Sequence, residues 1–192
     1  AGGLYNHKKY FSDLFYNPLW LCYTRANYFQ INIERGYFME KIKSFTINHD
    51  TLEVGMYISR IDDDIITYDI RLVKPNNGYF LSTGSIHTIE HLFATYARNT
   101  KWSKHVIYVG PMGCRTGYYL LTRGLSHEQA IELVQQSFAF IANFSGEIPG
   151  CKKHECGNYL DHDLLAAQQD IIPFLKRIEH YTPSDLHYAE DC

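Results

Sequence analysis

His87 and His91 are the residues whose types and spacing point most directly to chemistry. Side chains four residues apart lie on one face of a helix, where two imidazoles can hold one metal ion. Glu90 stands between them and could move protons beside that metal. The order His-x-x-Glu-His is the inverted zincin pattern, in which both histidines bind metal and the glutamate serves as acid and base. The segment therefore predicts a metal-binding helix that also carries an acid–base group.

A catalytic zinc-type site commonly has three protein ligands and one open position, so a third ligand must come from elsewhere in the chain. The candidates cluster downstream: Cys151, His154, Glu155, Cys156 and His162. A site of two histidines and one cysteine favours zinc or another borderline metal over calcium or magnesium. Two other interpretations stay open, namely that Cys151 and Cys156 are ordinary exposed thiols or that this cluster forms a separate structural site.

Cys114 lies in a second segment with chemical potential, the Gly-rich turn of residues 111–117. A thiol in such a turn between strands is accessible, free of helix packing and able to react. The alternative is a structural turn with a buried cysteine, because free cysteine is among the most buried residue types. Both interpretations stay open on composition alone.

The composition describes an ordinary globular protein. The length of 192 residues fits one domain, and a hydrophobic share of 45% is enough for a sizeable core. The net charge is -3 with both signs interspersed, so we expect no nucleic-acid partner. No apolar run approaches the ~20 residues that a membrane-spanning helix needs, so we expect no membrane partner. Cysteines without a tight framework indicate reduced thiols and a cytoplasmic location.

Residues 1–38 differ from the sequence that follows. They are rich in aromatic residues and show no sustained period of strand or helix type. Glu34-Arg35-Gly36 could be encoded by a purine-rich ribosome-binding site shortly before a Met39 start codon. We therefore expect residues 1–38 to be translated upstream sequence and residues 39–192 to form a single catalytic domain. The alternative is a genuine N-terminal extension that packs its aromatic side chains on the domain.

The strands are expected in two pairs. Residues 66–73 alternate between apolar and polar side chains, which is typical of a strand, and residues 52–60 resemble its hairpin partner across a turn at 61–64. Two further segments are rich in Val, Ile and Tyr and favour strands, residues 105–109 and residues 117–122.

Helices are expected at residues 85–98, after Ser126 and at residues 161–180. Ser126 and Gln129 fit a capping box at the start of the second helix. Pro173 should kink or divide the third helix. Strand pairs followed by helices predict an α+β fold, with an antiparallel sheet and the helices packed on one of its faces.

Taken together, a series of landmarks resembles the S-ribosylhomocysteine lyase family, whose members make the precursor of autoinducer-2. The resemblance runs from about Met39 to about Arg177. The landmarks are, in order, Ser44-Phe45 with His49, Asp69-Ile70-Arg71 with Pro75-Asn76, the segment from His87 to His91, the turn from Pro111 to Tyr119, and Cys156-Gly157 with His162-Asp163. Each landmark is short, but the ordered set is highly specific.

The resemblance implies roles for the residues already singled out. The family's metal ligands match His87, His91 and Cys156. Its two acid–base residues match Glu90 and Cys114. The metal implied is one divalent ion per subunit, Fe(II), which zinc or cobalt can replace.

The resemblance also implies how substrate is held. The family's substrate-contacting positions match Ser44, His49 and Arg71, which would be read as ordinary solvated residues without the family. In the family the active sites lie at a homodimer interface, so some of these side chains are expected to reach the metal of the partner subunit.

The reaction implied is cleavage of the thioether of S-ribosylhomocysteine, giving homocysteine and 4,5-dihydroxy-2,3-pentanedione. The C–S bond is remote from the sugar carbonyl, so the carbonyl must first migrate along the ribose by enediol tautomerisation. β-Elimination then expels the homocysteine thiolate.

Two positions depart from the family pattern. Tyr108 begins a segment in which many members have Asp-x-Ser, and Asn48 stands where Asp often precedes the family's histidine. A rival interpretation is an inverted zincin-type metallopeptidase, for which Glu155 is available as third ligand. A non-catalytic metal-binding domain and a cysteine-nucleophile hydrolase are further alternatives.

Overall fold

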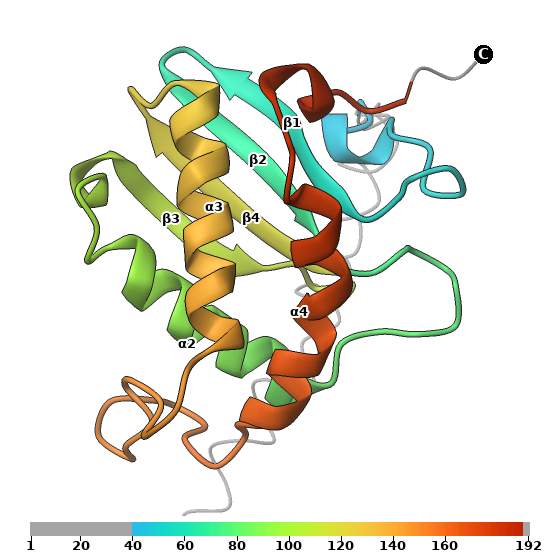
Figure 1. Ribbon diagram of the computed structural model, residues 1–192. Helices are drawn as coiled ribbons and strands as arrows, with labels where there is room; N and C mark the ends of the chain where they lie inside the picture. Colours follow the sequence, from blue (N-terminus) through green and yellow to red (C-terminus); the bar gives the residue numbers. More distant parts are fainter. Residues whose placement is uncertain (1–39, 190–192) are drawn as a thin grey trace, which may run out of the picture. The chain divides into compact units, whose positions relative to one another are not determined.

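A computed structural model describes residues 40–189 (Figure 1). The helices and strands of the described residues belong to one unit, Ile42–Cys192. The prediction that residues 1–38 are translated upstream sequence lies outside the described residues. Short 3-10 helices accompany the longer elements: η1 (Lys43–Phe45), η2 (Ser103–His105) and η3 (Pro183–Leu186).

Within the described residues, four antiparallel strands form one sheet in the order β1-β2-β4-β3. The strands are β1 (Gly55–Asp62), β2 (Ile65–Arg71), β3 (Val106–Pro111) and β4 (Gly117–Arg123). With the helices described below, this sheet confirms the predicted α+β class. The two predicted strand pairs are present, because β1 pairs with β2 and β3 pairs with β4.

The first hairpin turn is tighter than predicted. Ile61 and Asp62 were expected in the turn, but they still pair with β2. Asp63 adopts a left-handed conformation with φ 51°, and with Asp64 it makes a two-residue turn. Such turns need positive φ, which Asp tolerates better than most residues. The hairpin therefore extends two residues further than the apolar alternation indicated.

Side chains alternate between the two faces of the sheet. Tyr68 and Ile70 of β2 are fully buried on one face, beneath the helices. The intervening residues of β2 and their neighbours point to the opposite face, called the open face below. It carries Tyr57, Ser59, Thr67, Asp69, Arg71, Tyr108, Tyr119 and Leu121.

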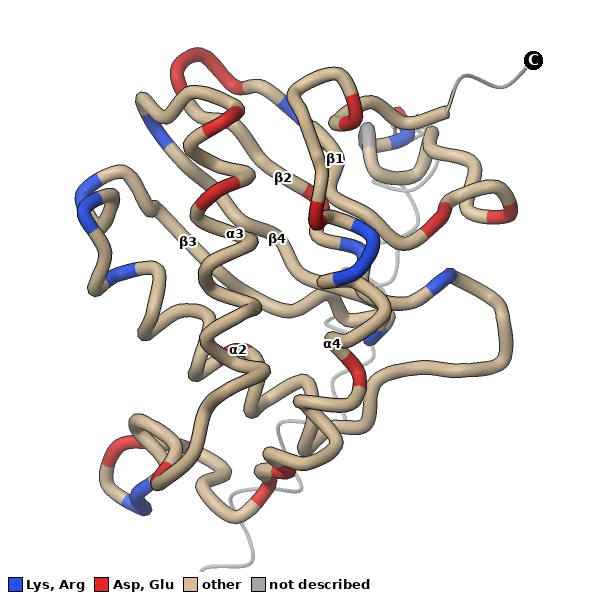
Figure 2. The backbone as a smooth tube through the Cα atoms, viewed as in Figure 1, with Lys and Arg blue, Asp and Glu red and all other residues tan. Residues whose placement is uncertain are grey.

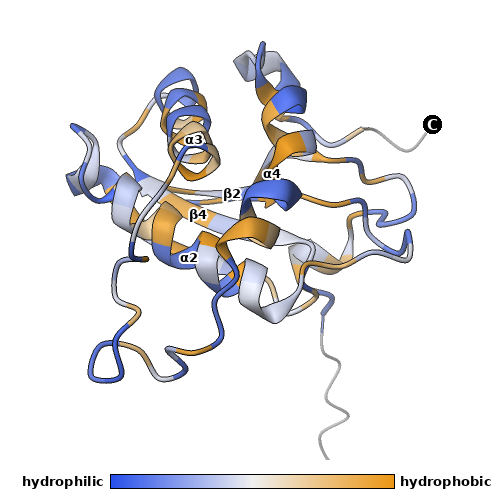
Figure 3. Cartoon of the chain, turned by 60° about the horizontal axis from the view of Figure 1, so that its bottom comes forward, coloured by the Kyte–Doolittle hydropathy of each residue, from blue (hydrophilic) through white to orange (hydrophobic). Residues whose placement is uncertain are grey.

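In the described part of the chain, three α-helices cover the other face (Figures 1 and 3). They are α2 (Thr83–Ala97), α3 (His127–Ala142) and α4 (Leu164–Ile178). The capping box of Ser126 and Gln129 is confirmed at the start of α3. Ser82 caps α2, so this helix begins two residues before the predicted position. Asp163 caps α4 by accepting from the Ala166 N–H at 2.9 Å, so α4 begins later than predicted.

Pro173 was predicted to kink or divide the last helix, and it does not divide it. α4 continues through Pro173 to Ile178. The ring of Pro173 is on the exposed side of the helix, whereas Ile171, Phe174 and Ile178 are buried on the inner side. Burial of these side chains offsets the backbone hydrogen bond that proline cannot make.

Charged residues of both signs are distributed along the described part of the chain. Lys and Arg are spread among Asp and Glu over several elements (Figure 2). Among residues 40–189, no helix combines the length and the hydrophobicity needed to cross a bilayer.

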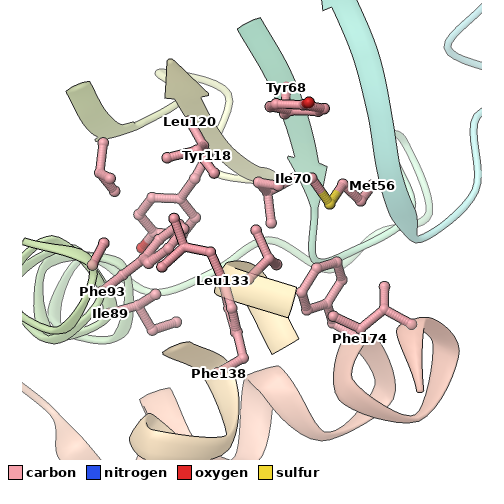
Figure 4. Packing of buried hydrophobic residues seen from close by; sticks show 14 of the residues in the cluster. Met56, Tyr68, Ile70, Ile89, Phe93, Tyr118, Leu120, Leu133, Phe138 and Phe174 are labelled. Carbon is pink, nitrogen blue, oxygen red and sulfur yellow. The ribbon is translucent and has the colours of Figure 1, made fainter. Parts of the chain in front are cut away.

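A row of aromatic rings joins the helices to the sheet (Figure 4). The ring of Phe93 in α2 lies 6.4 Å from Tyr118 in β4 and 5.1 Å from Phe138 in α3, measured between centroids. Phe138 in turn lies 4.7 Å from Phe174 in α4. Phe138 therefore contacts the two other helices at the centre of the core.

We predict that Phe138→Ala lowers the free energy of unfolding by about 3–5 kcal/mol, because it leaves a cavity where three helices meet. Ile172→Ala is the control, since Ile172 is 59% exposed on α4. We expect the control to change stability by no more than about 0.5 kcal/mol. Denaturant titration followed by circular dichroism measures both, and equal losses would contradict the assigned core.

Candidate active site

Helix α2 holds His87 and His91 side by side. Ser82 fixes the first turn by accepting a hydrogen bond from the Ser85 N–H at 3.1 Å. The Tyr118 hydroxyl of β4 donates to the Ile86 carbonyl at 2.5 Å, which ties the helix to the sheet next to His87. The rings of His87 and His91 are half-buried, with centroids 4.6 Å apart and planes at 88°. The spacing in the sequence therefore does bring two imidazoles together.

Cys156 and His162 join them from residues 143–163, the loop between α3 and α4. The possible ligand atoms of His87, His91, Cys156 and His162 all lie within 4.8 Å of one another. His87 Nε2 is 3.3 Å from Cys156 Sγ, and the His162 ring stacks on the His87 ring at 4.0 Å. These four residues are called the His–Cys cluster below.

Backbone carbonyls orient the two helix histidines. His87 Nδ1 lies 2.9 Å from the Asp161 carbonyl oxygen, and His91 Nδ1 lies 2.7 Å from that of Pro149. A carbonyl oxygen can only accept, so Nδ1 carries the proton in each ring. Nε2 is then left with a lone pair directed elsewhere, which is the arrangement typical of metal-ligating histidines.

The loop approaches His91 closely at Gly150. This residue has φ +72°, and a Cβ atom built on it would lie 3.3 Å from His91 Nδ1. A side chain here would meet both backbone strain and a crowded imidazole. The contact explains why glycine follows Pro149, whose carbonyl receives the His91 proton.

His162 completes a donor set that fits a metal ion. Its Nδ1 lies 3.3 Å from the Thr88 hydroxyl, and its Nε2 is buried without a hydrogen-bond partner. Burial lowers the pKa of His162, and the neighbouring His87 and His91 lower it further, so the neutral ring is favoured. Three imidazoles and one thiol suit a borderline divalent metal such as zinc, iron or cobalt.

The other third-ligand candidates lie outside this cluster. Glu155 is 3.6 Å from His154, and the Cys151 thiol is 3.9 Å from a Glu147 carboxylate oxygen. Of the residues proposed from the sequence, the structure therefore gathers Cys156 and His162 around the helix histidines. Glu155, which the peptidase interpretation needs as a ligand, is not among the gathered residues.

Glu90 lies in the helix between the two histidines and is half-buried. Burial raises the pKa of the Tyr118 hydroxyl well above its usual value, and the nearby Glu90 carboxylate raises it further. Glu90 lies in the helix that the Tyr118 hydroxyl ties to the sheet.

Cys114 is exposed, so the alternative of a buried structural cysteine is wrong. The turn closes through hydrogen bonds from Met112 N–H to the Gly117 carbonyl and from Arg115 N–H to the Met112 carbonyl, both at 2.9 Å. Arg115 adopts a left-handed conformation with φ 58°. The Cys114 thiol lies 3.0 Å from the Thr116 hydroxyl.

Arg71, a substrate-contacting position according to the family resemblance, is 2% exposed on the open face. Its Nη2 donates to Asp69 at 2.6 Å, and its Nη1 donates to Thr116 at 2.5 Å and lies 3.9 Å from Cys114 Sγ. Burial lowers the pKa of Arg71, but the Asp69 carboxylate reverses this and leaves it raised. The guanidinium is therefore a fixed positive charge beside the thiol.

Ser44 lies toward the same open face. Ser44 lines a cavity of about 350 Å³ together with Thr67 and Tyr119. His49 Nδ1 donates to the Ile47 carbonyl at 2.9 Å. Among the described residues, hydrogen bonds and ion pairs join Arg71 to Cys114 but join neither to the His–Cys cluster.

Comparison with known proteins accounts for this combination of residues. A family model described as S-ribosylhomocysteinase (LuxS) matches residues 42–184. The chain belongs to the S-ribosylhomocysteinase (LuxS) family. An S-ribosylhomocysteine lyase from Phocaeicola vulgatus is 47% identical over 157 residues, which cover 78% of this chain and 98% of the relative. Relatives of the same name from Clostridium acetobutylicum and Finegoldia magna are 42% and 43% identical, each over 79% of this chain and 100% of the relative.

The range matched to the S-ribosylhomocysteinase family includes the His–Cys cluster, Arg71 and Cys114. The sequence analysis assigned no role to Asp69, Thr116 or Tyr188, whose hydrogen bonds lead to Arg71 and Cys114. Asp69 and Thr116 lie beside Arg71 and Cys114 in segments already singled out, so their positions offered a hint. Tyr188, which donates to Asp69 at 3.1 Å, lies beyond the matched range and offered none.

We predict that Cys156→Ala weakens metal binding by at least ~100-fold, since it removes the one thiol of the His–Cys cluster. Cys151→Ala is the matched control, because Cys151 is in the same loop but outside the cluster. Titration with cobalt(II), followed through the cobalt–thiolate absorption, measures both affinities. Unchanged binding by the Cys156 variant would move the ligand role to another residue.

Proposed function

We propose that this protein is a metal-dependent S-ribosylhomocysteine lyase, which cleaves the thioether of S-ribosylhomocysteine to homocysteine and 4,5-dihydroxy-2,3-pentanedione, the autoinducer-2 precursor. The observation that carries the proposal is 42–47% identity to proteins named S-ribosylhomocysteine lyase across nearly their whole length. The site adds independent support, since it contains a group of residues that could hold a metal ion and an exposed thiol beside a buried cation.

We assign the metal to His87, His91 and Cys156, with His162 as an additional possible donor. The metal proposed is one Fe(II) per subunit, and zinc or cobalt suits the same imidazole and thiol donors. When bound, it would supply a Lewis acid for the oxygen atoms of the sugar.

Carbonyl migration requires groups that take a proton from one sugar carbon and return it to the next. We assign these roles to Cys114 and Glu90. Cys114 is exposed to substrate, and the Arg71 guanidinium can balance the charge of its thiolate. Glu90 is next to His91 in sequence, so it belongs to the metal-binding helix itself. β-Elimination then releases homocysteine once the carbonyl stands next to the carbon whose proton is lost.

Ser44, His49 and Arg71 are proposed to bind the substrate. The positions of Ser44 and Arg71 support this assignment, because Ser44 lines the cavity on the open face and Arg71 lies beside Cys114. Tyr108 also lies on this face. Many family members have an aspartate at this position, and we do not assign the role of that aspartate to this chain.

We further propose a homodimer with active sites at its interface. Among residues 40–189, α2, α3 and α4 leave the open face uncovered, and it bears exposed apolar side chains, including Tyr108 at 50% and the neighbouring Phe45 at 70%. A second copy on this face would cover them. The second copy could also bring its own His–Cys cluster close to Arg71 and Cys114 of the first. Within one chain, no hydrogen bond or ion pair of the described residues connects Arg71 or Cys114 to the cluster.

The proposal includes one catalytic domain at residues 39–192 and a cytoplasmic location. Free thiols at Cys114, Cys151 and Cys156 support a reducing compartment. We do not propose a metallopeptidase, because Glu155 pairs with His154 and the exposed thiol at Cys114 would have no role.

The lyase assignment predicts thiol release from S-ribosylhomocysteine by anaerobically purified Fe(II) protein. Cys114→Ala and Glu90→Gln should each lower the rate by ~10²–10⁴-fold, the usual contribution of a general acid–base group. Both variants should keep their metal, since neither residue belongs to the His–Cys cluster. No release from folded, metal-loaded wild-type protein would reject the proposed function.

The dimer assignment predicts that Tyr108→Lys yields a monomer, because it places a charge on the open face. Ile172→Lys serves as control, since Ile172 is similarly exposed but lies on α4, over the other face of the sheet. Analytical ultracentrifugation should give a dimer for the wild type and the control. A dimeric Tyr108 variant would point to another interface.

A further inference from the structure

Tyr188 is a side chain near the end of the described residues that reaches into the proposed site. Its ring stacks on Tyr57 of β1, with centroids 4.8 Å apart and planes at 16°. Its hydroxyl donates to the Asp69 carboxylate at 3.1 Å and accepts a hydrogen bond from Ser59. Burial raises the pKa of Tyr188 far above its usual value, so the hydroxyl stays protonated and donates.

The Asp69 carboxylate links this hydroxyl to the reactive thiol. Tyr188 and Arg71 both donate to the same oxygen, Asp69 Oδ2. Arg71 uses Nη2 for that contact, which leaves Nη1 directed at Thr116 and at Cys114 Sγ, 3.9 Å away. The contacts form an unbroken path from Tyr188 through Asp69 and Arg71 to Cys114.

Asp69 and Arg71, at the centre of this path, have few other hydrogen-bond partners to which they could turn. Asp69 is 1% exposed, and its other oxygen, Oδ1, has no hydrogen-bond partner. Arg71 Nε is likewise buried without a partner. The orientation of the carboxylate is therefore set by its two donors, and loss of one frees the carboxylate to rotate and the guanidinium to follow.

We infer that Tyr188 is a positioning residue for the proposed lyase reaction: through Asp69, its hydroxyl holds the Arg71 guanidinium against the Cys114 thiol. The inference rests on the proposed function for its biological meaning, but the contact path can be tested without turnover. It extends the site beyond residue 184, where the family match ends.

Tyr188→Phe is the direct test, because it removes the hydroxyl and keeps the stack on Tyr57. Tyr57→Phe is the matched control, since the Tyr57 hydroxyl donates to the Glu53 carbonyl and not to Asp69. The readout is the rate constant for alkylation of Cys114 by iodoacetamide on metal-loaded protein at neutral pH. Mass spectrometry of the tryptic peptide from His105 to Arg115 separates Cys114 from the other cysteines.

We expect Tyr188→Phe to slow alkylation by about fivefold, because the guanidinium no longer stays beside the thiolate, and Tyr57→Phe to leave the rate unchanged. In an Asp69→Asn background, Tyr188→Phe should have little further effect, as expected for residues acting in one path. An unchanged rate in Tyr188→Phe would overturn the inference, as would equal slowing by Tyr57→Phe or full slowing in the Asp69→Asn background.

The lyase assay on the same variants separates the two proposals. A kcat that falls in Tyr188→Phe in step with the alkylation rate supports both. Wild-type protein that releases no thiol, while its Cys114 still shows the Tyr188-dependent alkylation, would reject the lyase function and leave the positioning path supported.

Discussion

The imidazoles of His87 and His91 donate through Nδ1 to the carbonyls of Asp161 and Pro149, and the arrangement of the site follows from these two bonds. Each bond leaves Nε2 free with its lone pair. Both carbonyls belong to residues 143–163, so the loop must close over α2 before the rings are oriented. The helix is fixed from its other side, where the Tyr118 hydroxyl holds the Ile86 carbonyl to β4. The core, the helix and the loop therefore together determine the orientation of the Nε2 atoms of His87 and His91.

A second constraint lies on the open face of the sheet. Asp69 and Arg71 form an ion pair there with exposed fractions of 2% and 3% for their side chains. A buried ion pair is stable only when further hydrogen bonds compensate its lost hydration. Thr116 and Tyr188 supply some of them, yet Asp69 Oδ1 and Arg71 Nε stay unpaired. Burial of these two atoms without partners costs free energy, which the attraction between the two charges has to offset.

Much of this fold follows from local sequence patterns. The alternation around Tyr68, the capping box at Ser126 and the four-residue spacing of His87 and His91 each report on neighbours along the chain. The failures concern tertiary context. Burial of the inner side of α4 lets the helix continue through Pro173, and no local pattern in β2 indicated that Arg71 is buried in an ion pair with Asp69. Tyr188 was unforeseeable because its partners, Tyr57 and Asp69, lie far away in the sequence and no local pattern records a contact of that kind.

The loop that supplies Cys156 and His162 is ordered although it buries no side chain of its own. From residue 142 to residue 166 no side chain is buried, so this long segment is folded without a hydrophobic core of its own. Ordering each residue costs roughly 1–2 kcal/mol of backbone entropy, which few hydrogen bonds at a surface can offset. An ion bound by His87, His91 and Cys156 would crosslink the loop to α2 and take the place of that missing core. Local opening of the loop would then depend on the concentration of free metal, while the helices and sheet keep their stability. The supply of the ion would therefore set the rate at which proteases cleave this segment.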